Sequence, residues 1–402
     1  MNKQKAVLRG MIVLYFVIGL EVLIMISPAA GFFYAAFNPF LLSLAQSPVT
    51  RWLTAFYLPH MVSPPGAFLK IIRVAGSVLF VSGGAVFLLC ATQVYYHKFA
   101  GKGVALGGLY SRIRHPQYLG LGLAGIGLSI LWPRFLVIAL WSIMATLYFL
   151  LAKDEERRML EQFGDEYSRY MDRTGMFLPR DAESAIEAFL PIRNTVIRAA
   201  VLLLLLWAGT VGGAFALRSY TVERLPLWSR GSVTALAILP VDLQLMDLRM
   251  ASVLGLPEIR DRLAQEPGSF LAYFMPVDYV MQGMIADTGG EWQLYKRHHT
   301  VAMIWDWVFH PFRHLEGGHD GMHHDRYGGA PEDTGSGSML RRIIFLKVNM
   351  PGRIVRPADD FDINVARTPL FVVDVDVHTM VVESLRDLRR ETGWGNVPTP
   401  MF

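Results

Sequence analysis

Long apolar runs separated by short polar stretches fill the chain from Met11 to Leu217. A backbone inside a lipid bilayer must close its hydrogen bonds internally, so runs of this length predict transmembrane helices. The expected spans are residues 11–29, 71–94, 118–131, 135–151 and 196–217. The third and fourth are short against the roughly 20 residues that a bilayer core requires. Because only Trp132-Pro133-Arg134 joins them, they are expected to form an antiparallel hairpin.

The composition changes beyond residue 217, where charged residues, Gly and Pro are spread as in a water-soluble domain. The sequence therefore predicts an all-α integral membrane domain with about five transmembrane helices over residues 1–217. A soluble α+β domain is expected over residues 218–402. Within it, strands are expected at 340–348 and 369–378, and a helix at 379–392.

Apolar and polar residues alternate at the end of the second expected strand. Side chains of successive strand residues point to opposite faces, so the valines of this segment share one face. The polar residues on the other face are Asp374, Asp376 and His378. We expect a solvated sheet face here rather than a binding site.

The net charge is +4 over 402 residues, which is too small to indicate a nucleic-acid partner. Basic residues cluster before the first span, between the second and third, and after the fourth. If five spans alternate, these clusters share one side of the membrane, which the positive-inside rule makes cytoplasmic. This predicts a multi-pass protein with its soluble domain on the opposite side. Cys90 is the single cysteine, so no intramolecular disulfide is expected.

Ionisable residues crowd both ends of the predicted hairpin. Gly-Leu-Tyr-Ser-Arg-Ile-Arg-His-Pro-Gln-Tyr runs before it, from Gly108 to Tyr118, and Asp154-Glu155-Glu156 follows it. Ionisable groups that converge at a membrane boundary are typical of a functional site. Glu21, inside the first span, is a further carboxylate expected to face a polar cavity or a partner.

The order and spacing of these residues resemble the isoprenylcysteine carboxyl methyltransferase and phospholipid methyltransferase superfamily. Residues 102–179 fill its pattern, which is G-x-Y-x-x-x-R-H-P-x-Y, a helical hairpin, and E-E-x-x-x-L-x-x-F-G-x-x-Y-x-x-Y. Members of that superfamily are integral-membrane enzymes. The resemblance implies a methyltransferase with S-adenosylmethionine as its cofactor. It also implies a lipophilic or membrane-delivered acceptor bearing a thiol, carboxylate or amine.

The resemblance extends to individual residues. The implied cofactor-binding residues are Lys102, Gly103, Val104, Ala105, Tyr110, His115, Pro116, Tyr118 and Glu155. The candidate catalytic residues are His115, Arg114 and Glu156. Carboxylates suit the ammonium or ribose hydroxyls of the cofactor, whereas His115 and Arg114 suit its carboxylate or a polar substrate head. The prenylcysteine branch carries a substrate-associated arginine where this chain has Leu151, which argues against a prenylcysteine acceptor.

Two other functions stay open from the sequence. One is a membrane NADPH-dependent reductase of the sterol-reductase type, whose C-terminal helices are similar. The other is a degenerate membrane anchor for a C-terminal binding module. Gly120, Gly122 and Gly125 match a dinucleotide-binding G-x-G-x-x-G, but no strand precedes them and they lie in an apolar span. Small residues there indicate close helix packing.

Seven of the eleven histidines fall between residues 298 and 324. Two of them have the i,i+4 spacing that places two imidazoles on one helical face, as zinc sites require. The candidate metal ligands are His310, His314, His319 and His323. We favour a polar surface loop over a metal site, because Pro311 disturbs a regular helix between the first two.

Overall fold

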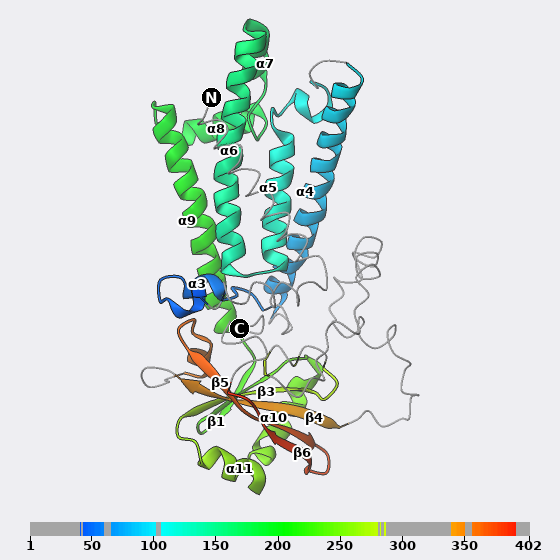
Figure 1. Cartoon of the computed structure of the whole chain (residues 1–402), viewed down its shortest axis with the longest axis vertical. Coiled ribbons are helices and arrows are strands. Elements are labelled where there is room, and N and C mark those ends of the chain that lie inside the picture. Colours follow the sequence, from blue (N-terminus) through cyan, green and yellow to red (C-terminus); the bar gives the residue numbers. More distant parts are fainter. Residues whose placement is uncertain are drawn as a thin grey trace. The chain divides into compact units, whose positions relative to one another are not determined.

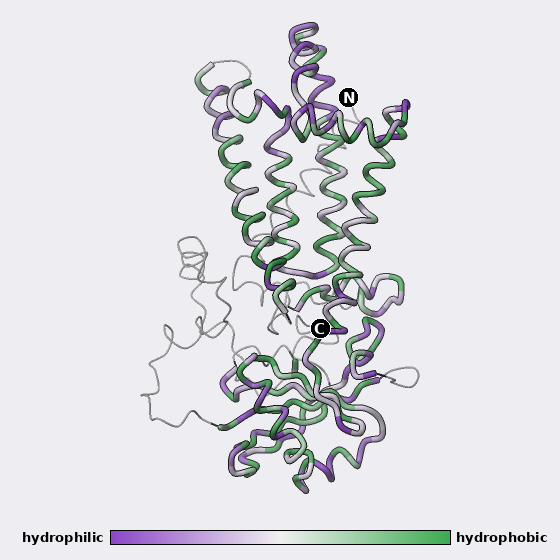
Figure 2. The backbone as a smooth tube through the Cα atoms, turned by 180° about the vertical axis from the view of Figure 1, so that it is seen from behind, coloured by the Kyte–Doolittle hydropathy of each residue, from purple (hydrophilic) through white to green (hydrophobic). Residues whose placement is uncertain are grey.

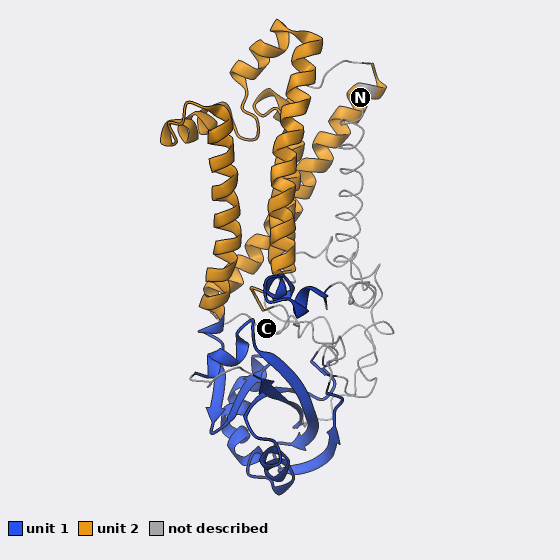
Figure 3. Ribbon diagram, turned by 60° about the vertical axis from the view of Figure 1, so that its left-hand side comes forward, with its two compact units in different colours: residues 1–55, 61–63, 222–402 blue, residues 56–60, 64–221 orange. Residues whose placement is uncertain are grey.

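The computed structural model describes residues 41, 43–59, 66–101, 106–279, 282, 285–286, 339–349 and 356–390. The chain divides into two compact units (Figure 3). The helical unit consists of Phe56–His60 and Pro64–Thr221. The sheet unit consists of Met1–Ala55, Met61–Ser63 and Val222–Phe402.

Long helices run side by side in the helical unit (Figure 1). They are α4 (Ala67–Phe99), α5 (Pro116–Leu131), α6 (Phe135–Phe163) and α9 (Thr195–Val222). Shorter elements connect them, namely η1 (Gly108–Ser111), α7 (Asp165–Arg173) and α8 (Arg180–Phe189). Figure 2 shows that the long helices are apolar along most of their length, with polar residues gathered toward the end that carries α7 and α8.

Within the described part of the chain, three segments are long and apolar enough to cross a membrane: Ala67–His97, Phe135–Phe163 and Thr195–Val222. They contain the second, fourth and fifth expected spans, but five spans are not confirmed. α5 has 16 residues, or about 24 Å at 1.5 Å per residue, which is less than the roughly 30 Å of a hydrocarbon core. The expected first span, with Glu21, lies outside the described residues.

Glycines let α5 pack closely against both neighbouring helices. A Cβ atom added at Gly127 would lie 2.3 Å from the backbone nitrogen of Phe80 on α4. One added at Gly125 would lie 2.5 Å from the Trp141 ring on α6, whose indole N–H donates to the Gly122 carbonyl at 2.8 Å. The glycine-rich segment is therefore a helix-packing surface, as its sequence indicates.

The turn between α5 and α6 is fixed by two aromatic residues and an arginine of α9. The backbone N–H of Tyr57 donates to the Pro133 carbonyl at 2.7 Å. The Arg134 guanidinium lies 4.3 Å from the centroid of the Phe56 ring. Arg218, near the end of α9, donates to the Phe56 carbonyl. α9 therefore runs from the α8 end of the helical unit to the hairpin turn, where the chain leaves this unit.

The sheet unit is built on a six-stranded sheet in the order β1-β2-β3-β4-β5-β6. β2 and β3 are parallel, and all other neighbours are antiparallel. The strands are β1 (Leu227–Arg230), β2 (Val233–Ala237), β3 (Ser269–Pro276), β4 (Leu340–Asn349), β5 (Ala366–Asp376) and β6 (Val381–Asp387). The helical elements of this unit are α3 (Arg51–Thr54), α10 (Val241–Val253), α11 (Pro257–Ala264) and η4 (Pro357–Phe361).

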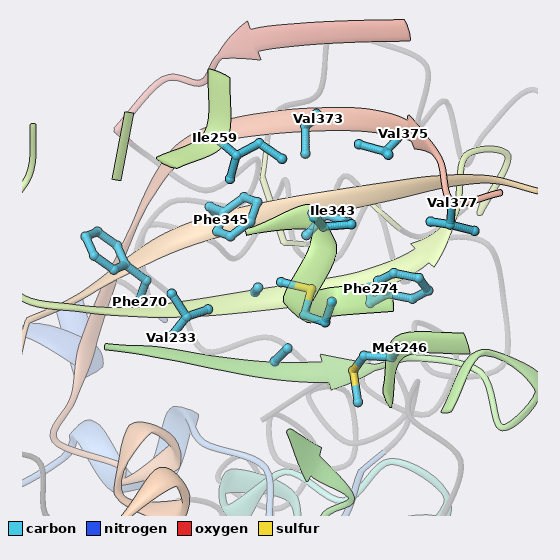
Figure 4. Packing of buried hydrophobic residues seen from close by; sticks show 14 of the residues in the cluster. Val233, Met246, Ile259, Phe270, Phe274, Ile343, Phe345, Val373, Val375 and Val377 are labelled. Atoms are coloured by element: carbon cyan, nitrogen blue, oxygen red, sulfur yellow. The ribbon is translucent and has the colours of Figure 1, made fainter. Parts of the chain in front are cut away.

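One face of this sheet forms an apolar core with α10 and α11 (Figure 4). Met246 and Ile259 from the helices are buried with Phe274, Ile343 and Val373 from the strands. The two helices form the crossover that a parallel strand pair requires. This arrangement of a sheet with packed helices agrees with the expected α+β composition of the region.

Both expected strands are present, as β4 and β5, but the helix expected at 379–392 is wrong. Val381–Asp387 forms β6, which pairs antiparallel with β5. Met380 has φ +59° and donates its N–H to the Asp376 carbonyl at 2.8 Å, which closes the hairpin. Pairing with β5 thus outweighs the local helical preference, because strand formation depends strongly on cross-strand neighbours.

The expected solvated face at the end of β5 is wrong for Asp374, whereas His378 is exposed as expected. The valines are buried as predicted, but Asp374 on the opposite face is only 6% exposed. Arg342 on β4 donates to both carboxylate oxygens of Asp374 at 2.6 Å, and also to Gln282 Oε1 at 2.6 Å. A carboxylate is tolerated in this position because a bidentate partner compensates its charge and its hydrogen bonds.

Gly127→Ala should destabilise the helical unit, because the added methyl group meets the backbone of α4. Overpacking of this kind typically costs about 1–3 kcal/mol. Gly122→Ala is the matched control, since a Cβ atom there meets nothing within 4 Å and alanine is the better helix former. Thermal unfolding of both variants in detergent measures the difference. Equal melting temperatures would contradict the close packing of α4 on α5.

The path of α9 leads us to expect Ser168 and Ser232 on opposite sides of the membrane. Ser168 is exposed on α7, at the α8 end of the helical unit, and Ser232 is exposed in the turn after β1. In a Cys90→Ser background, an impermeant thiol reagent should label the Ser232→Cys variant in intact cells and the Ser168→Cys variant only after lysis. The same response from both variants would rule out the expected orientation.

Candidate functional site

The polar residues singled out in the sequence come together at one end of the helical unit. η1, the start of α5, the last third of α6 and the turn between α7 and α8 contribute them. His115 is the residue just before α5, and Pro116 is its first residue. α6 continues past its apolar part and ends at Phe163, directly before Gly164. The φ of Gly164 is +51°, a conformation that favours glycine, which explains why the helix stops here.

The imidazole of His115 lies between two carboxylates. Its Nδ1 is 3.2 Å from Glu155 Oε2, and its Nε2 is 3.8 Å from Glu156 Oε1. The ring stacks on Tyr118 at a centroid distance of 5.7 Å and contacts Phe177 at 6.2 Å. His115 is 3% exposed, and neither ring nitrogen makes a well-oriented hydrogen bond to a described residue. The ring is therefore held by its charge between the two carboxylates.

The neighbouring charges and the burial of His115 shift its pKa in opposite directions. Burial alone would lower the pKa of the ring, because it penalises the charged form. The carboxylates of Glu155 and Glu156 outweigh burial and raise the pKa of His115 above its ordinary value of 6.5. The ring consequently carries more positive charge near neutral pH than a free histidine, which suits contact with an anionic group.

Glu155 is the carboxylate of the cluster that is partly exposed to solvent. Its Oε1 accepts a hydrogen bond from the Tyr118 hydroxyl at 2.6 Å, and its side chain is 35% exposed. Tyr118 is held in turn by stacking on Tyr148, with centroids 5.3 Å apart. This packing fixes the orientation of Glu155 and leaves part of its carboxylate for a cationic or hydroxyl-bearing ligand.

Glu156 is the buried carboxylate, and it is paired with Arg114. Arg114 Nε donates to Glu156 Oε1 at 2.6 Å, and both side chains are more than nine-tenths buried. Lys153 Nζ lies 3.3 Å from Glu156 Oε2. Arg114 also donates to the carbonyls of Met171, at 3.0 Å, and Thr174. The guanidinium of Arg114 therefore connects the start of α5 to α6 and to the end of α7.

Tyr110 lies next to this cluster and is buried. Its hydroxyl donates to Gln117 Oε1 at 3.1 Å, and its carbonyl accepts from the Tyr170 hydroxyl at 2.6 Å. Burial raises the pKa of Tyr110 and raises that of Tyr170 to about 12, so both hydroxyls stay protonated near neutral pH. These contacts attach η1 to both α5 and α7.

The structure brings five of the predicted site residues into direct contact, namely Arg114, His115, Tyr118, Glu155 and Glu156. Tyr110 is adjacent, and Pro116 begins α5. The predicted cofactor-binding residues Lys102, Gly103, Val104 and Ala105 lie outside the described residues. So does the His-rich segment with His310, His314, His319 and His323. Among the residues that are described, no group of three or more His, Cys, Asp or Glu could hold a metal ion.

Three further residues shape the site without having been predicted. Phe177 covers the His115 ring, and Tyr148 supports Tyr118. Glu183 Oε1 accepts from the backbone N–H groups of Phe177, at 2.9 Å, and Leu178, at 3.2 Å. No local pattern marks these positions, because their contacts arise from the α7–α8 turn and from the packing of α5 on α6.

Comparison with known proteins agrees with the resemblance seen in the sequence. Residues 74–166 match the model of the phospholipid methyltransferase family. Methanethiol S-methyltransferase of Pseudomonas deceptionensis is 38% identical over 72 residues, which are 18% of this chain and 26% of that protein. The chain thus matches about a quarter of the relative's length. No solved structure matches significantly. These matches confirm the predicted family resemblance and support a membrane methyltransferase.

The raised pKa of His115 predicts that stability falls with rising pH. The folded protein binds the imidazole proton more tightly than the unfolded chain does. The resulting stabilisation is therefore complete below pH 6.5 and is lost as the pH rises through the raised pKa. Melting temperatures measured in detergent across this range should fall more steeply for the parent than for His115→Gln. Parallel curves for the two proteins would show that His115 does not carry the expected charge.

Proposed function

We propose that the protein is an integral-membrane methyltransferase that uses S-adenosylmethionine and binds this donor around His115 and Glu155. The observation that carries the proposal is the His115 ring, which is buried beside two carboxylates without a well-oriented hydrogen bond from the described residues. A buried ionisable group whose pKa is shifted by specific charged partners is typical of a functional site. The ring lies within the segment that matches a methyltransferase family.

The side chains of the site fit the chemistry of this donor. S-adenosylmethionine supplies a methyl group on a sulfonium and presents an ammonium, a carboxylate, ribose hydroxyls and an adenine ring. The partly exposed carboxylate of Glu155 suits the ammonium or the ribose hydroxyls, and the charged ring of His115 suits the carboxylate. Tyr110 is the candidate aromatic contact of the adenine. Tyr118 already stacks on His115 and Tyr148 and positions Glu155 through its hydroxyl. By resemblance, residues 102–105 and Pro116 complete the pocket.

Arg114 and Glu156 complete the proposed catalytic set with His115. Methyl transfer depends on holding the reacting groups in line and on excluding water. Burial of all three side chains keeps water away from the imidazole. The ion pair also helps to orient the ring, because Arg114 holds the Glu156 carboxylate that lies 3.8 Å from His115 Nε2.

α6 provides a connection between the bilayer and this site. Its 29 residues extend about 44 Å at 1.5 Å per residue, more than the roughly 30 Å of a hydrocarbon core. The excess length carries Glu155 and Glu156 beyond the apolar part of the helix. In the proposed function, an acceptor dissolved in the membrane and a donor from the cytoplasm meet at this end of α6.

A small thiol is the acceptor class that we favour. The relative from Pseudomonas deceptionensis is named for methanethiol. Leu151 stands where prenylcysteine enzymes carry an arginine by resemblance, so a charged prenylcysteine is disfavoured as acceptor. Methyl transfer is favoured over the reductase alternative because both matches are to methyltransferases. Complete filling of the motif argues against a degenerate anchor.

Glu155→Gln and His115→Ala should each weaken S-adenosylmethionine binding without unfolding the protein. A lost hydrogen bond to a charged group costs about 1.5–3 kcal/mol, or roughly 10- to 150-fold in the dissociation constant. Isothermal titration of the detergent-purified protein measures this loss. Glu161→Gln is the matched control, because Glu161 lies on the same helix and pairs with the exposed Arg157 at 3.1 Å.

Parent-like affinity in both site variants would refute the residue assignment. Binding of NADPH instead of S-adenosylmethionine would refute the proposed activity. With a methyl-labelled donor, the same preparation should methylate a short alkanethiol. Transfer only to a fatty carboxylate or to an amine headgroup would overturn the thiol assignment and leave the methyltransferase proposal intact.

A further inference from the structure

The turn between α7 and α8 reaches the site although it lies beyond the family match at residues 74–166. We name residues 174–178 the cap turn. The backbone N–H of Arg114 donates to the Gly175 carbonyl at 2.8 Å, and that of His115 donates to the Met176 carbonyl at 3.0 Å. The residues before α5 and the cap turn therefore run alongside each other, which brings Phe177 against the His115 ring.

Charged side chains hold both ends of the cap turn. At its start, the Arg114 guanidinium donates to the Thr174 carbonyl. At its end, a single carboxylate oxygen of Glu183 accepts the backbone N–H groups of Phe177 and Leu178, at 2.9 and 3.2 Å. Backbone N–H groups in a turn need partners outside regular structure, and a charged acceptor binds them strongly.

The shape of the turn leaves no room for a side chain at position 175, where the chain has glycine. A Cβ atom there would lie 1.9 Å from the Leu178 carbonyl oxygen and 2.9 Å from the carboxyl carbon of Glu183. The turn is therefore folded tightly back on itself, with the Glu183 carboxylate packed against it. The position of Phe177 thus depends directly on the position of Glu183.

We propose that Glu183 is a positioning residue of the donor site. It holds the cap turn closed, so that Phe177 shields the His115 ring from water and keeps it between Glu155 and Glu156. This inference rests on the proposed function, because the site that Glu183 shapes is the proposed donor site. It adds to that site a residue of α8, outside the segment that the family match covers.

Graded substitution at Glu183 in the full-length protein tests this role. Glu183→Ala removes both hydrogen bonds to the cap turn, whereas Glu183→Gln keeps an uncharged oxygen acceptor. S-adenosylmethionine binding should weaken about tenfold or more in Glu183→Ala and by less in Glu183→Gln. Glu187→Gln is the matched control, one helical turn further along α8, where the Glu187 carboxylate pairs with Arg198 at 2.9 Å. It should bind the donor like the parent.

The pH profile of donor binding distinguishes positioning from a loss of fold. The titratable and charged groups facing the His115 ring are Glu155 and Glu156 on α6, Tyr118 on α5, and Arg114, which directly precedes His115 in the chain. When the turn opens and the His115 ring moves away from Glu155 and Glu156, it loses the two carboxylates that raise its pKa, and the pKa returns toward the ordinary histidine value of 6.5. The pH above which binding falls should therefore move downward in Glu183→Ala. A purely structural role would reduce the folded fraction and leave this midpoint unchanged.

Each outcome separates the inference from the proposed function. If the parent does not bind S-adenosylmethionine, the proposed function fails. If the parent binds it and Glu183→Ala has the same affinity and pH midpoint, the positioning role is overturned and the proposed function stands. Should Glu183→Ala not fold, Phe177→Ala replaces it, since that change leaves the backbone hydrogen bonds of the turn in place. An unshifted midpoint in Phe177→Ala would equally overturn the role of the cap turn.

Discussion

The buried ion pair between Arg114 and Glu156 is the interaction on which the site depends. Removing two charges from water costs several kcal/mol per ion unless the protein compensates both fully. Arg114 is compensated by Glu156 and by the carbonyls of Met171 and Thr174, and Glu156 also by Lys153. Because these partners come from α6 and the end of α7, the compensation exists only when α5, α6 and α7 are packed together. The geometry of the site therefore depends on the packing of all three helices at this end of the helical unit.

The neighbouring carboxylates of Glu155 and Glu156 on α6 have different surroundings and therefore suit different roles. Successive helical residues point about 100° apart, so Glu156 faces the buried guanidinium while Glu155 stays 35% exposed. One helix thus presents a carboxylate that holds the structure and a carboxylate available to a ligand. His115 lies within reach of both, which explains how a buried imidazole keeps a raised pKa.

Features that depend on nearby residues could be predicted from the sequence. The apolar segments of α4, α6 and α9 follow from local composition, and the end of α6 follows from Gly164. The grouping of His115 with Glu155 was predicted from motif order, because a helical hairpin returns the chain to the side from which it started. The length and hydropathy of a segment and the backbone freedom of a glycine are local properties, so these features can be predicted without knowledge of the tertiary structure.

Other features were decided by partners distant in the sequence. Val381–Asp387 became a strand because β5 lies beside it, and Asp374 became buried because Arg342 on another strand neutralises it. Glu183 and Phe177 acquired their contacts from the turn that folds back over His115. By itself the sequence determined which segments are apolar and which chemical groups are available. The tertiary structure decided which groups are buried and paired, because the free energy of burying a charge or pairing a strand depends on residues that only folding brings together.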